Sequence, residues 1–284
     1  MNAPRRGVLH NEHVLLGARF SEDDEVETPH VTSYANEVTP GEGLEGALLA
    51  DLTGCAYLLV SGTSAEAFGR AMLAGRNLAV GDASFEAVLT GDGSVCSVPL
   101  ALRTGDTELV LLDPTARGAA LEGWARFLAS VSQGDGAPLA GVEVEDAGGM
   151  LVPLLLAGAA AETVLADYVG SPADLPVPGR VSSLHLDAIP AVVARLPRVG
   201  ATAPAFLVLV PPTSARILWR SLLSFREVSP VGSEAVRALT EGLPWGSLLL
   251  GEGPARATSE ELAGWGLLRA GEGYVGARGL AGRG

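Results

Sequence analysis

Apolar runs alternate with turn sequences along most of the chain beyond about residue 45, and the first of them predicts a strand followed by a helix. The run over 57–60 is continuous and apolar, as in a buried strand. Thr63 and Glu66 then have the spacing of a capping box, which begins a helix. Phe68 and Met72 lie one helical turn apart, so we expect them to face the core.

Three further strand-like runs follow with no helical pattern between them. Glycine-containing turns join these runs, so we expect them to pair as an antiparallel meander. After the last run, Asp113 and Pro114 are typical of the cap and first residue of a helix. The strand-like runs cover 85–90, 95–102 and 108–112.

The second half of the chain repeats this order of elements. The segment 58–66 has an echo 96 positions later, and the segment 109–115 has one 98 positions later. Two matches at nearly one offset indicate an internal duplication. Because glycine and alanine are abundant, a chance likeness of two strand-to-helix corners is the alternative.

These patterns predict an α+β fold of two similar units, each an antiparallel sheet with helices. A doubly wound parallel fold would need a helix between successive strands, and 85–112 offers none. We expect an N-terminal arm and loop over 1–47, a first unit over 48–135, a second over 136–250, and a C-terminal linker and tail over 251–284.

The amino-acid composition and net charge limit the classes of partner that this protein can be expected to bind. The 284 residues are 48% hydrophobic and 18% charged, as in a packed globular protein. A net charge of −14, with no Lys at all, weighs against nucleic acid and anionic membrane surfaces. The apolar run 150–161 is about half of the roughly 20 residues a bilayer span needs, and no apolar leader segment is present, so we expect a cytoplasmic protein.

Generic catalytic and metal signatures are few. His10 and His13, with Glu12 between them, have a spacing that could hold a metal, but we expect solvated side chains on a mobile arm. Cys55 and Cys96 lie in apolar runs and are predicted to be buried free thiols. We therefore assign no metal ligand and no catalytic residue from these patterns.

Six segments in a fixed order resemble the T-protein (aminomethyltransferase) family of the glycine cleavage system and its folate-binding relatives. The resemblance spans residues 34–280. The segments are ADLT leading into LLVSGTSAEAF, then ASFEAVLTGDGSV, ELVLLD, LLLAGAAAETVL, AFLVLVPPTSARILWRSLL with VSPVGSEAVRALTEGLP, and SEELAGWGLLRAGEGYVGARGL.

The resemblance implies a folate-binding fold around a central cavity, where tetrahydrofolate receives a one-carbon unit from the lipoyl arm of H-protein. It also implies a carboxylate just after the GDG-type hairpin, where this chain has Ser97 and Val98. A glutamate element of the family falls on 200–203, which holds no acid, and Glu234 reverses the charge at a position where the family has arginine. We expect the family's C-terminal barrel domain to be absent.

Three functions stay open. The first is a T-protein-like protein with a degraded catalytic site, which binds a ligand or a protein. The second is an active tetrahydrofolate-dependent one-carbon transferase that uses a displaced carboxylate, Asp92 or Asp106. The third is a non-catalytic subunit of a multi-subunit amine oxidase.

The predicted ligand site follows from the resemblance. A pterin needs a stacking surface and polar partners, and these roles fall on Phe85 for stacking, Asp51 and Ser97 for polar contacts, and Glu234 as an acceptor. The ligand would be tetrahydrofolate or a related small molecule. We do not expect H-protein to dock, because such partners are generally acidic and this chain is acidic too. The sequence offers one candidate basic patch, formed by Arg216, Arg220 and Arg226.

Overall fold

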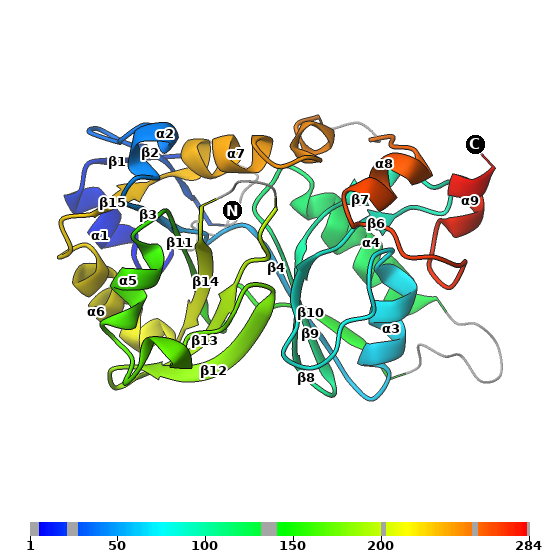
Figure 1. The fold of residues 1–284 in the computed structure, drawn as a ribbon, viewed down its shortest axis with the longest axis horizontal. Helices are drawn as coiled ribbons and strands as arrows, with labels where there is room; N and C mark the ends of the chain where they lie inside the picture. Colours follow the sequence, from blue (N-terminus) through cyan, green and yellow to red (C-terminus); the bar gives the residue numbers. More distant parts are fainter. Residues whose placement is uncertain (1–5, 22–27, 132–140, 200–202, 252–254, 283–284) are drawn as a thin grey trace. The chain divides into compact units, whose positions relative to one another are not determined.

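The computed structural model describes residues 6–21, 28–131, 141–199, 203–251 and 255–282. It divides the chain into two compact units, each built from two separate stretches (Figure 1). The first unit comprises Met1–Gly54 and Gly148–Thr240, and the second comprises Cys55–Ala147 and Glu241–Gly284.

The first unit contains an open sheet with the order β12-β13-β14-β11-β3-β15. β15 pairs with β3 in parallel, and the other neighbours in this sheet are antiparallel. The strands are β3 (Ala47–Asp51), β11 (Val152–Ala157), β12 (Arg180–Leu186), β13 (Ile189–Arg195), β14 (Ala205–Val210) and β15 (Val228–Val231).

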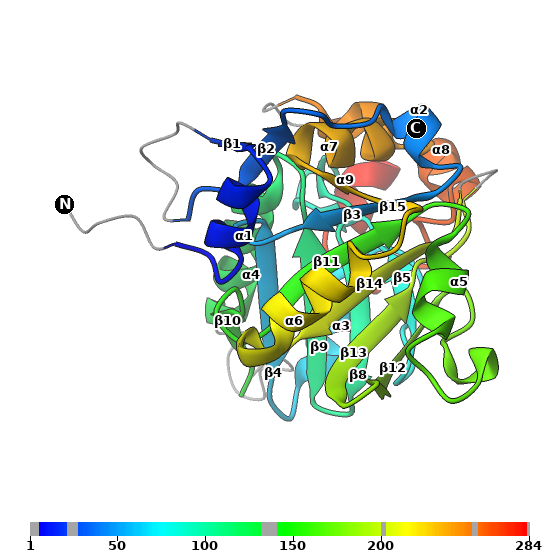
Figure 2. The same ribbon diagram turned by 90° about the vertical axis from the view of Figure 1, so that its left-hand side faces the viewer.

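Two helices, α5 (Ala161–Ala166) and α6 (Pro212–Leu222), cover one face of this sheet (Figure 2). α6 begins at a proline, which suits the first turn because a helix leaves that N–H unpaired. Its buried side chains recur at helical spacing and join the core of β11 and β14. They are Ala215, Leu218, Trp219 and Leu222.

The remaining elements of the first unit lie before β3 and after β11 and β15. β1 pairs with β2 as an antiparallel ribbon. The elements are α1 (His10–Leu15), β1 (Ala18–Phe20), β2 (Val31–Tyr34), α2 (Pro40–Gly43), η1 (Pro172–Asp174) and α7 (Ser233–Glu241), whose last residue falls in the second unit.

The second unit contains an open antiparallel sheet with the order β10-β4-β9-β8-β5, and a separate β6-β7 ribbon. The strands are β4 (Ala56–Ser61), β5 (Ala83–Phe85), β6 (Val88–Leu89), β7 (Val95–Ser97), β8 (Leu100–Gly105), β9 (Glu108–Asp113) and β10 (Glu143–Asp146). The helices are α3 (Ala65–Met72), α4 (Gly118–Ser130), η2 (Gly246–Leu249), α8 (Ser259–Gly264) and α9 (Ala277–Ala281).

α3 and α4 supply the apolar side chains that close the core of the second unit. Phe68 and Met72 of α3 are buried there, as their spacing predicts. Leu121 and Leu128 of α4 join them, together with residues of β4 and β9. The prediction of an α+β fold with antiparallel sheets is confirmed.

The unit boundaries differ from those expected from the sequence. The predicted arm over 1–47 contains helices and strands of the first unit, and β3, placed in the opposite unit by the sequence, pairs with β11. β10 falls beyond the predicted boundary at 135/136 but pairs with β4. The reason is that a strand joins the sheet whose edge it completes, and the local pattern does not specify that edge.

The predicted meander is broken at two points. Residues 85–90 were expected as one strand, but β5 ends at Phe85 and β6 begins at Val88. Residues 95–102 divide in the same way into β7 and β8 at Pro99, which has no N–H to donate to a ladder. The helix expected directly after Asp113 begins at Gly118, and Asp113 makes other hydrogen bonds.

The strand-to-helix corners that the sequence pairs at an offset of 96 have matching backbones. Gly62 follows β4 and Gly158 follows β11, and both have positive φ, at 119° and 144°. A Cβ on Gly158 would lie 2.2 Å from the carbonyl oxygen of Gly46, so the corner needs glycine for its conformation and its space.

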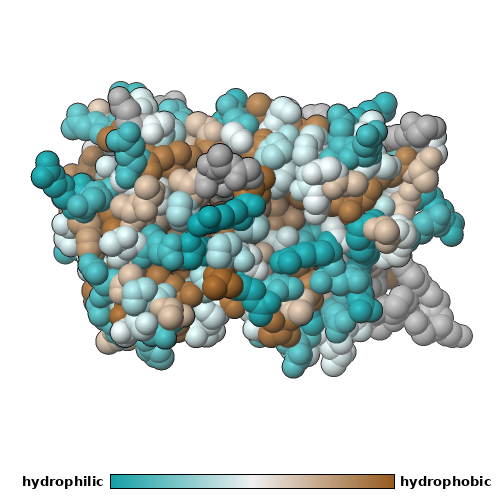
Figure 3. Space-filling view, in the orientation of Figure 1, coloured by the Kyte–Doolittle hydropathy of each residue, from teal (hydrophilic) through white to brown (hydrophobic). Residues whose placement is uncertain are grey.

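In the described residues, no helix is long and apolar enough to cross a membrane. On the face drawn in Figure 3, hydrophilic side chains are intermixed with hydrophobic ones over both units.

We expect Gly158→Ala to lower the free energy of unfolding by about 3 kcal/mol or more, because the added methyl meets backbone and φ is unfavourable. Gly123→Ala is the matched control, because Gly123 lies within α4 with no atom near its Cβ position, and should be neutral or stabilising. Urea denaturation measures both. A Gly158→Ala protein as stable as the control would contradict this reading of the corner.

Candidate functional site

Ser97 lies in β7 with its side chain fully buried. Its hydroxyl donates to Asp113 Oδ2 at 2.5 Å, and Asp113 Oδ1 accepts from the Thr115 N–H at 2.8 Å. Burial raises the pKa of Asp113, while the hydrogen bonds from Ser97 and Thr115 and the charge of Arg117 oppose that rise. The Ser97 hydroxyl was expected to contact a ligand, but it donates its hydrogen bond to the buried Asp113 carboxyl of the same unit.

Phe85 ends β5 and is partly buried. Its ring packs against Trp245, with centroids 5.5 Å apart and planes tilted by 59°. Trp245 is itself buried, and its indole nitrogen has no hydrogen-bond partner among the described residues. Within this unit, the Phe85 ring therefore already packs against another side chain, that of Trp245.

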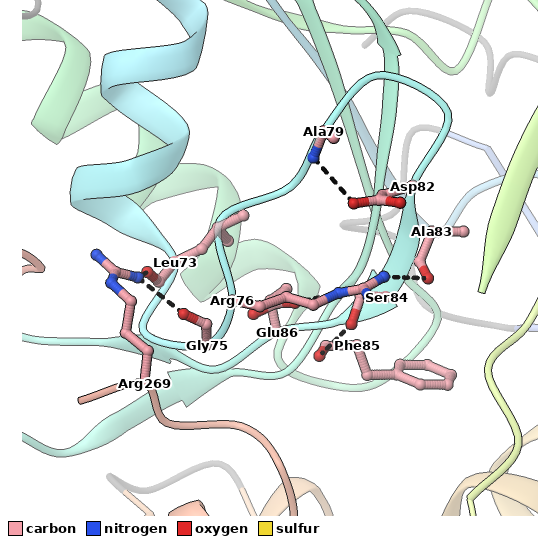
Figure 4. A network of polar contacts seen from close by, with 10 residues as sticks. All are labelled: Leu73, Gly75, Arg76, Ala79, Asp82, Ala83, Ser84, Phe85, Glu86 and Arg269. Atoms are coloured by element: carbon pink, nitrogen blue, oxygen red, sulfur yellow. Dashed lines mark hydrogen bonds and ion pairs between the residues drawn. The ribbon is translucent and has the colours of Figure 1, made fainter.

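Glu86 is a buried carboxyl that the sequence reading missed. Its side chain is fully buried, neither oxygen has a hydrogen-bond partner in the described part of the chain, and Arg76 Nε lies 3.9 Å from Oε1. A Cβ on Gly75 would lie 1.8 Å from Oε2, so the carboxyl packs directly against that backbone. Figure 4 shows the Phe85 ring pointing away from Glu86.

The pKa of Glu86 is raised to about 7 by burial, and the charges of Arg76 and Arg269 act in the opposite direction. Such a carboxyl can hold or release a proton near neutral pH. The sequence signal was an acid inside an apolar stretch, which alternation alone would have placed on a solvent face.

Arg269 ties the C-terminal segment of the second unit to the end of α3. Its guanidinium donates to the carbonyl oxygens of Leu73 and Gly75, two of the contacts drawn in Figure 4, and to those of Arg70 and Gly273. It also lies over the Tyr274 ring, 4.9 Å from the centroid. These contacts place a second positive charge in the neighbourhood of Glu86.

Asp51 belongs to a hydrogen-bonded chain in the first unit. His13 Nε2 lies 2.8 Å from Asp51 Oδ2, and His13 Nδ1 lies 2.8 Å from the Tyr34 hydroxyl. Thr53 donates to Asp51 Oδ1 from both its hydroxyl and its N–H. Burial raises the pKa of Tyr34, and the charges of Asp51 and Glu37 add to the rise. This series of hydrogen bonds joins α1, β2 and β3, so Asp51 has a structural role.

The expectation of solvated side chains on a mobile arm is wrong for Glu12 and His13, which are both buried. Glu12 accepts from Arg220 at 2.8 and 2.9 Å and lies 3.3 Å from Arg216, and the Arg220 contact lowers the pKa of Glu12. Two of the three arginines in the candidate basic patch are thus paired within the chain. The sequence could not show this, because Glu12 and Arg220 are 208 positions apart.

A shallow hollow with room for about one water molecule adjoins His13 and Asp51. His10 and His30 also line it, so the fold gathers three of the chain's four histidines there. No group of three or more His, Cys, Asp or Glu side chains within the described ranges is arranged to hold a metal ion.

Glu234 lies in the first turn of α7 and is exposed. Asp92 is exposed and accepts hydrogen bonds from Thr90 and Ser94 within the hairpin turn, and Asp106 is also exposed. Gly200, Ala201 and Thr202, part of the stretch that replaces the family's glutamate element, lie outside the described residues.

The predicted site residues are not gathered within either unit. In the second unit, Phe85 pairs with Leu100 and Ser97 pairs with Val88, on different ribbons. In the first unit, Asp51 is held by His13 while Glu234 faces solvent. A pterin would need Phe85 and Ser97 as free partners, and Trp245 and Asp113 already contact them. Within the second unit, Phe85 and Ser97 therefore each have a partner from the protein itself.

We expect Glu86→Gln to raise stability at pH 8 and to have little effect at pH 5. The folded pKa of about 7 lies above the ordinary value of 4.5, so wild-type stability falls as pH rises between these values. Since one pKa unit corresponds to about 1.4 kcal/mol, the variant should gain up to about 3 kcal/mol above pH 7. Chemical denaturation at both pH values measures this gain.

The control for this prediction is Glu145→Gln on the exposed face of β10. Its effect should be the same at pH 5 and pH 8. Equal effects of Glu86→Gln at the two pH values would show that the carboxyl is not a buried proton holder.

Comparisons with known proteins agree with the fold. No protein-family model and no curated protein matches the sequence. The structure is similar to the glycine cleavage system aminomethyltransferase T from Bartonella henselae, with a TM-score of 0.77 and 19% identity over 99% of this chain and 74% of that chain. The heterotetrameric sarcosine oxidase from Corynebacterium sp. U-96, in complex with pyrrole 2-carboxylate, gives a TM-score of 0.44 and 18% identity over 78% and 93%.

A TM-score of 0.44 is too low to equate two folds, whereas the first similarity covers nearly the whole of this chain. Its extent over this chain confirms the resemblance in architecture drawn from the six segments. An identity of 19% supports a shared fold but does not support a shared activity. The chain has the fold of a glycine cleavage system aminomethyltransferase T.

Proposed function

We propose that this chain is an aminomethyltransferase-like protein that keeps the T-protein fold, has lost aminomethyl transfer, and acts by binding a ligand or a protein. The observation that carries the proposal is the Ser97–Asp113 hydrogen bond. At the hairpin position where the family resemblance expects a carboxylate, this chain has a fully buried hydroxyl that donates to its own Asp113.

The other expected partners support the same conclusion. Trp245 contacts the Phe85 ring, and Glu234 is an exposed acid on a helix. A positioned carboxylate contributes about 10² or more to proton transfer. Replacing it with a hydroxyl that is already bonded removes that contribution.

A second candidate function is an active tetrahydrofolate-dependent transferase with a displaced carboxylate. Asp92 and Asp106 do not suit this role, because both are exposed and Asp92 closes the hairpin turn. Asp113 is nearer the hairpin position, with its carboxyl 2.5 Å from the Ser97 hydroxyl, but it is buried. The third candidate, an amine oxidase subunit, predicts self-association when the chain is expressed alone.

Calorimetric titration with tetrahydrofolate separates the first two functions. We expect no saturable heat at micromolar concentration, because the pterin partners are occupied within the protein. Micromolar binding, with aminomethyl transfer that Asp113→Asn abolishes, would establish the transferase instead. Light scattering on the same sample measures self-association.

We expect Ser97→Asp to destabilise the protein by about 3 kcal/mol or more at pH 8, because it places two buried carboxyls in contact. The double variant Ser97→Asp with Asp113→Asn removes the repulsion and should recover part of this loss. It also moves the carboxylate to the family's hairpin position. Denaturation measures the stabilities, and a gain of tetrahydrofolate affinity in the double variant would contradict the proposed loss of the site.

A further inference from the structure

The two large sheets end in four edge strands, and three of these carry features that hinder pairing with another chain. In β10, three of the four residues are acidic. β5 has only three residues, and β15 contains Pro230, which has no N–H to donate. Charge, short length and proline are the means by which natural sheets protect their edges. The fourth edge strand, β12, differs from these three.

β12 is long, and it is uncharged between its ends. Its seven residues read RVSSLHL, and the formal charge lies on the first of them. Within the described residues it pairs only with β13, in a register without a break. Figures 1 and 2 both draw β12 along the lower margin of the first unit. A strand paired on one side directs about half of its backbone N–H and C=O groups away from that partner, where they form a template for a further strand.

The middle of β12 is accessible, while its ends are anchored. Val181 and Leu186 are buried, and Leu186 belongs to the core of the first unit. Between them, Ser183 and His185 are exposed. The strand is therefore held in place by its own unit and still presents side chains and backbone to a partner.

The sequence of β12 is complementary to itself in an antiparallel pair. The register that pairs all seven residues places Ser183, the middle residue, opposite Ser183 of a second copy. Arg180 then lies opposite Leu186 of the second copy, next to its exposed Asp187. No like charges lie opposite each other in this register, and opposite charges come together at both ends of the pair.

We propose that β12 is an interface at which a second copy of this chain pairs antiparallel, so that the six-stranded sheets of two copies join into one. Each copy uses the same edge, so the contact closes on itself and forms dimers rather than longer assemblies. One strand pair buries much less surface than the roughly 1,600 Å² of a standard interface, so we expect a weak dimer with a Kd of about 10 to 100 µM.

Analytical ultracentrifugation of the full chain, over a concentration range of about 1 µM to 0.5 mM, tests the proposal. We expect a monomer–dimer equilibrium with no larger species. A protein that stays monomeric up to about 0.5 mM would overturn the proposal and leave the edge to a strand of a different protein.

Ser183→Lys places two positive charges opposite each other at the two-fold axis, so it should weaken dimerisation by about fivefold or more. Ser183 is exposed, so we expect the fold to be unchanged, which circular dichroism checks. The matched control is Ser259→Lys, the same change at the exposed first residue of α8 in the second unit. Equal weakening by both substitutions would mean that the dimer responds only to net charge, and the proposal would be wrong.

A disulfide reports the register directly. Ser183→Cys should give a covalent dimer on mild oxidation, because residues directly opposite in an antiparallel pair have Cβ atoms about 4.5 to 5.5 Å apart. The wild-type protein, whose free cysteines are Cys55 and Cys96, gives the background. Ser259→Cys should stay near that background. Cross-linking of Ser183→Cys no faster than that of Ser259→Cys would contradict the proposed pairing.

Self-association can also come from the amine oxidase function considered above, and Ser183→Lys separates the two sources. An oxidase subunit expressed alone would associate through an exposed apolar face, which this substitution leaves unchanged. Association that survives Ser183→Lys therefore contradicts pairing through β12 and favours the oxidase function. The tetrahydrofolate titration is independent of both results, because none of the predicted pterin residues lies in β12.

Discussion

A carboxyl buried in an apolar interior needs a hydrogen-bond donor beside it, and in this chain Asp113 has Ser97. The account of function depends on this constraint. Asp113 ends β9, so the bond joins a strand of the larger sheet to the β6-β7 ribbon. Without Ser97, the carboxyl would lose a bond that opposes the cost of its burial. The hydroxyl is therefore part of the folded core before any ligand arrives.

Elsewhere in both units, polar side chains are also paired with partners within the protein. In the first unit, the N-terminal segment is held by Glu12 with Arg220 and by His13 with Asp51. In the second unit, Arg269 donates to three carbonyl oxygens around the end of α3 and to that of Gly273 in its own segment. Glu86 differs, because it is buried without a hydrogen-bond partner in the described residues and its pKa is near 7. Its ionisation therefore costs the second unit stability as the pH rises towards neutrality.

The sequence predicted those parts of the fold that local signals control. Phe68 and Met72 at helical spacing, and glycines at matching corners 96 positions apart, require no knowledge of distant partners. Asp113-Pro114 misled in detail, because the aspartate that could cap a helix bonds instead to a serine 16 positions earlier. His13 and Asp51 are 38 positions apart, and nothing local indicates their contact. Polar contacts between residues far apart in the sequence determine which candidate side chains already have partners, and hydrophobic periodicity does not predict such contacts.

The most direct test follows the Asp113 carboxyl itself. Carbon-13 NMR of the aspartate carboxyls across a pH titration, assigned with Asp113→Asn and repeated with tetrahydrofolate, reports both its protonation and any ligand contact. The account predicts a midpoint above the ordinary aspartate value that tetrahydrofolate leaves unchanged. An ordinary midpoint, or one that moves when tetrahydrofolate is added, would contradict it.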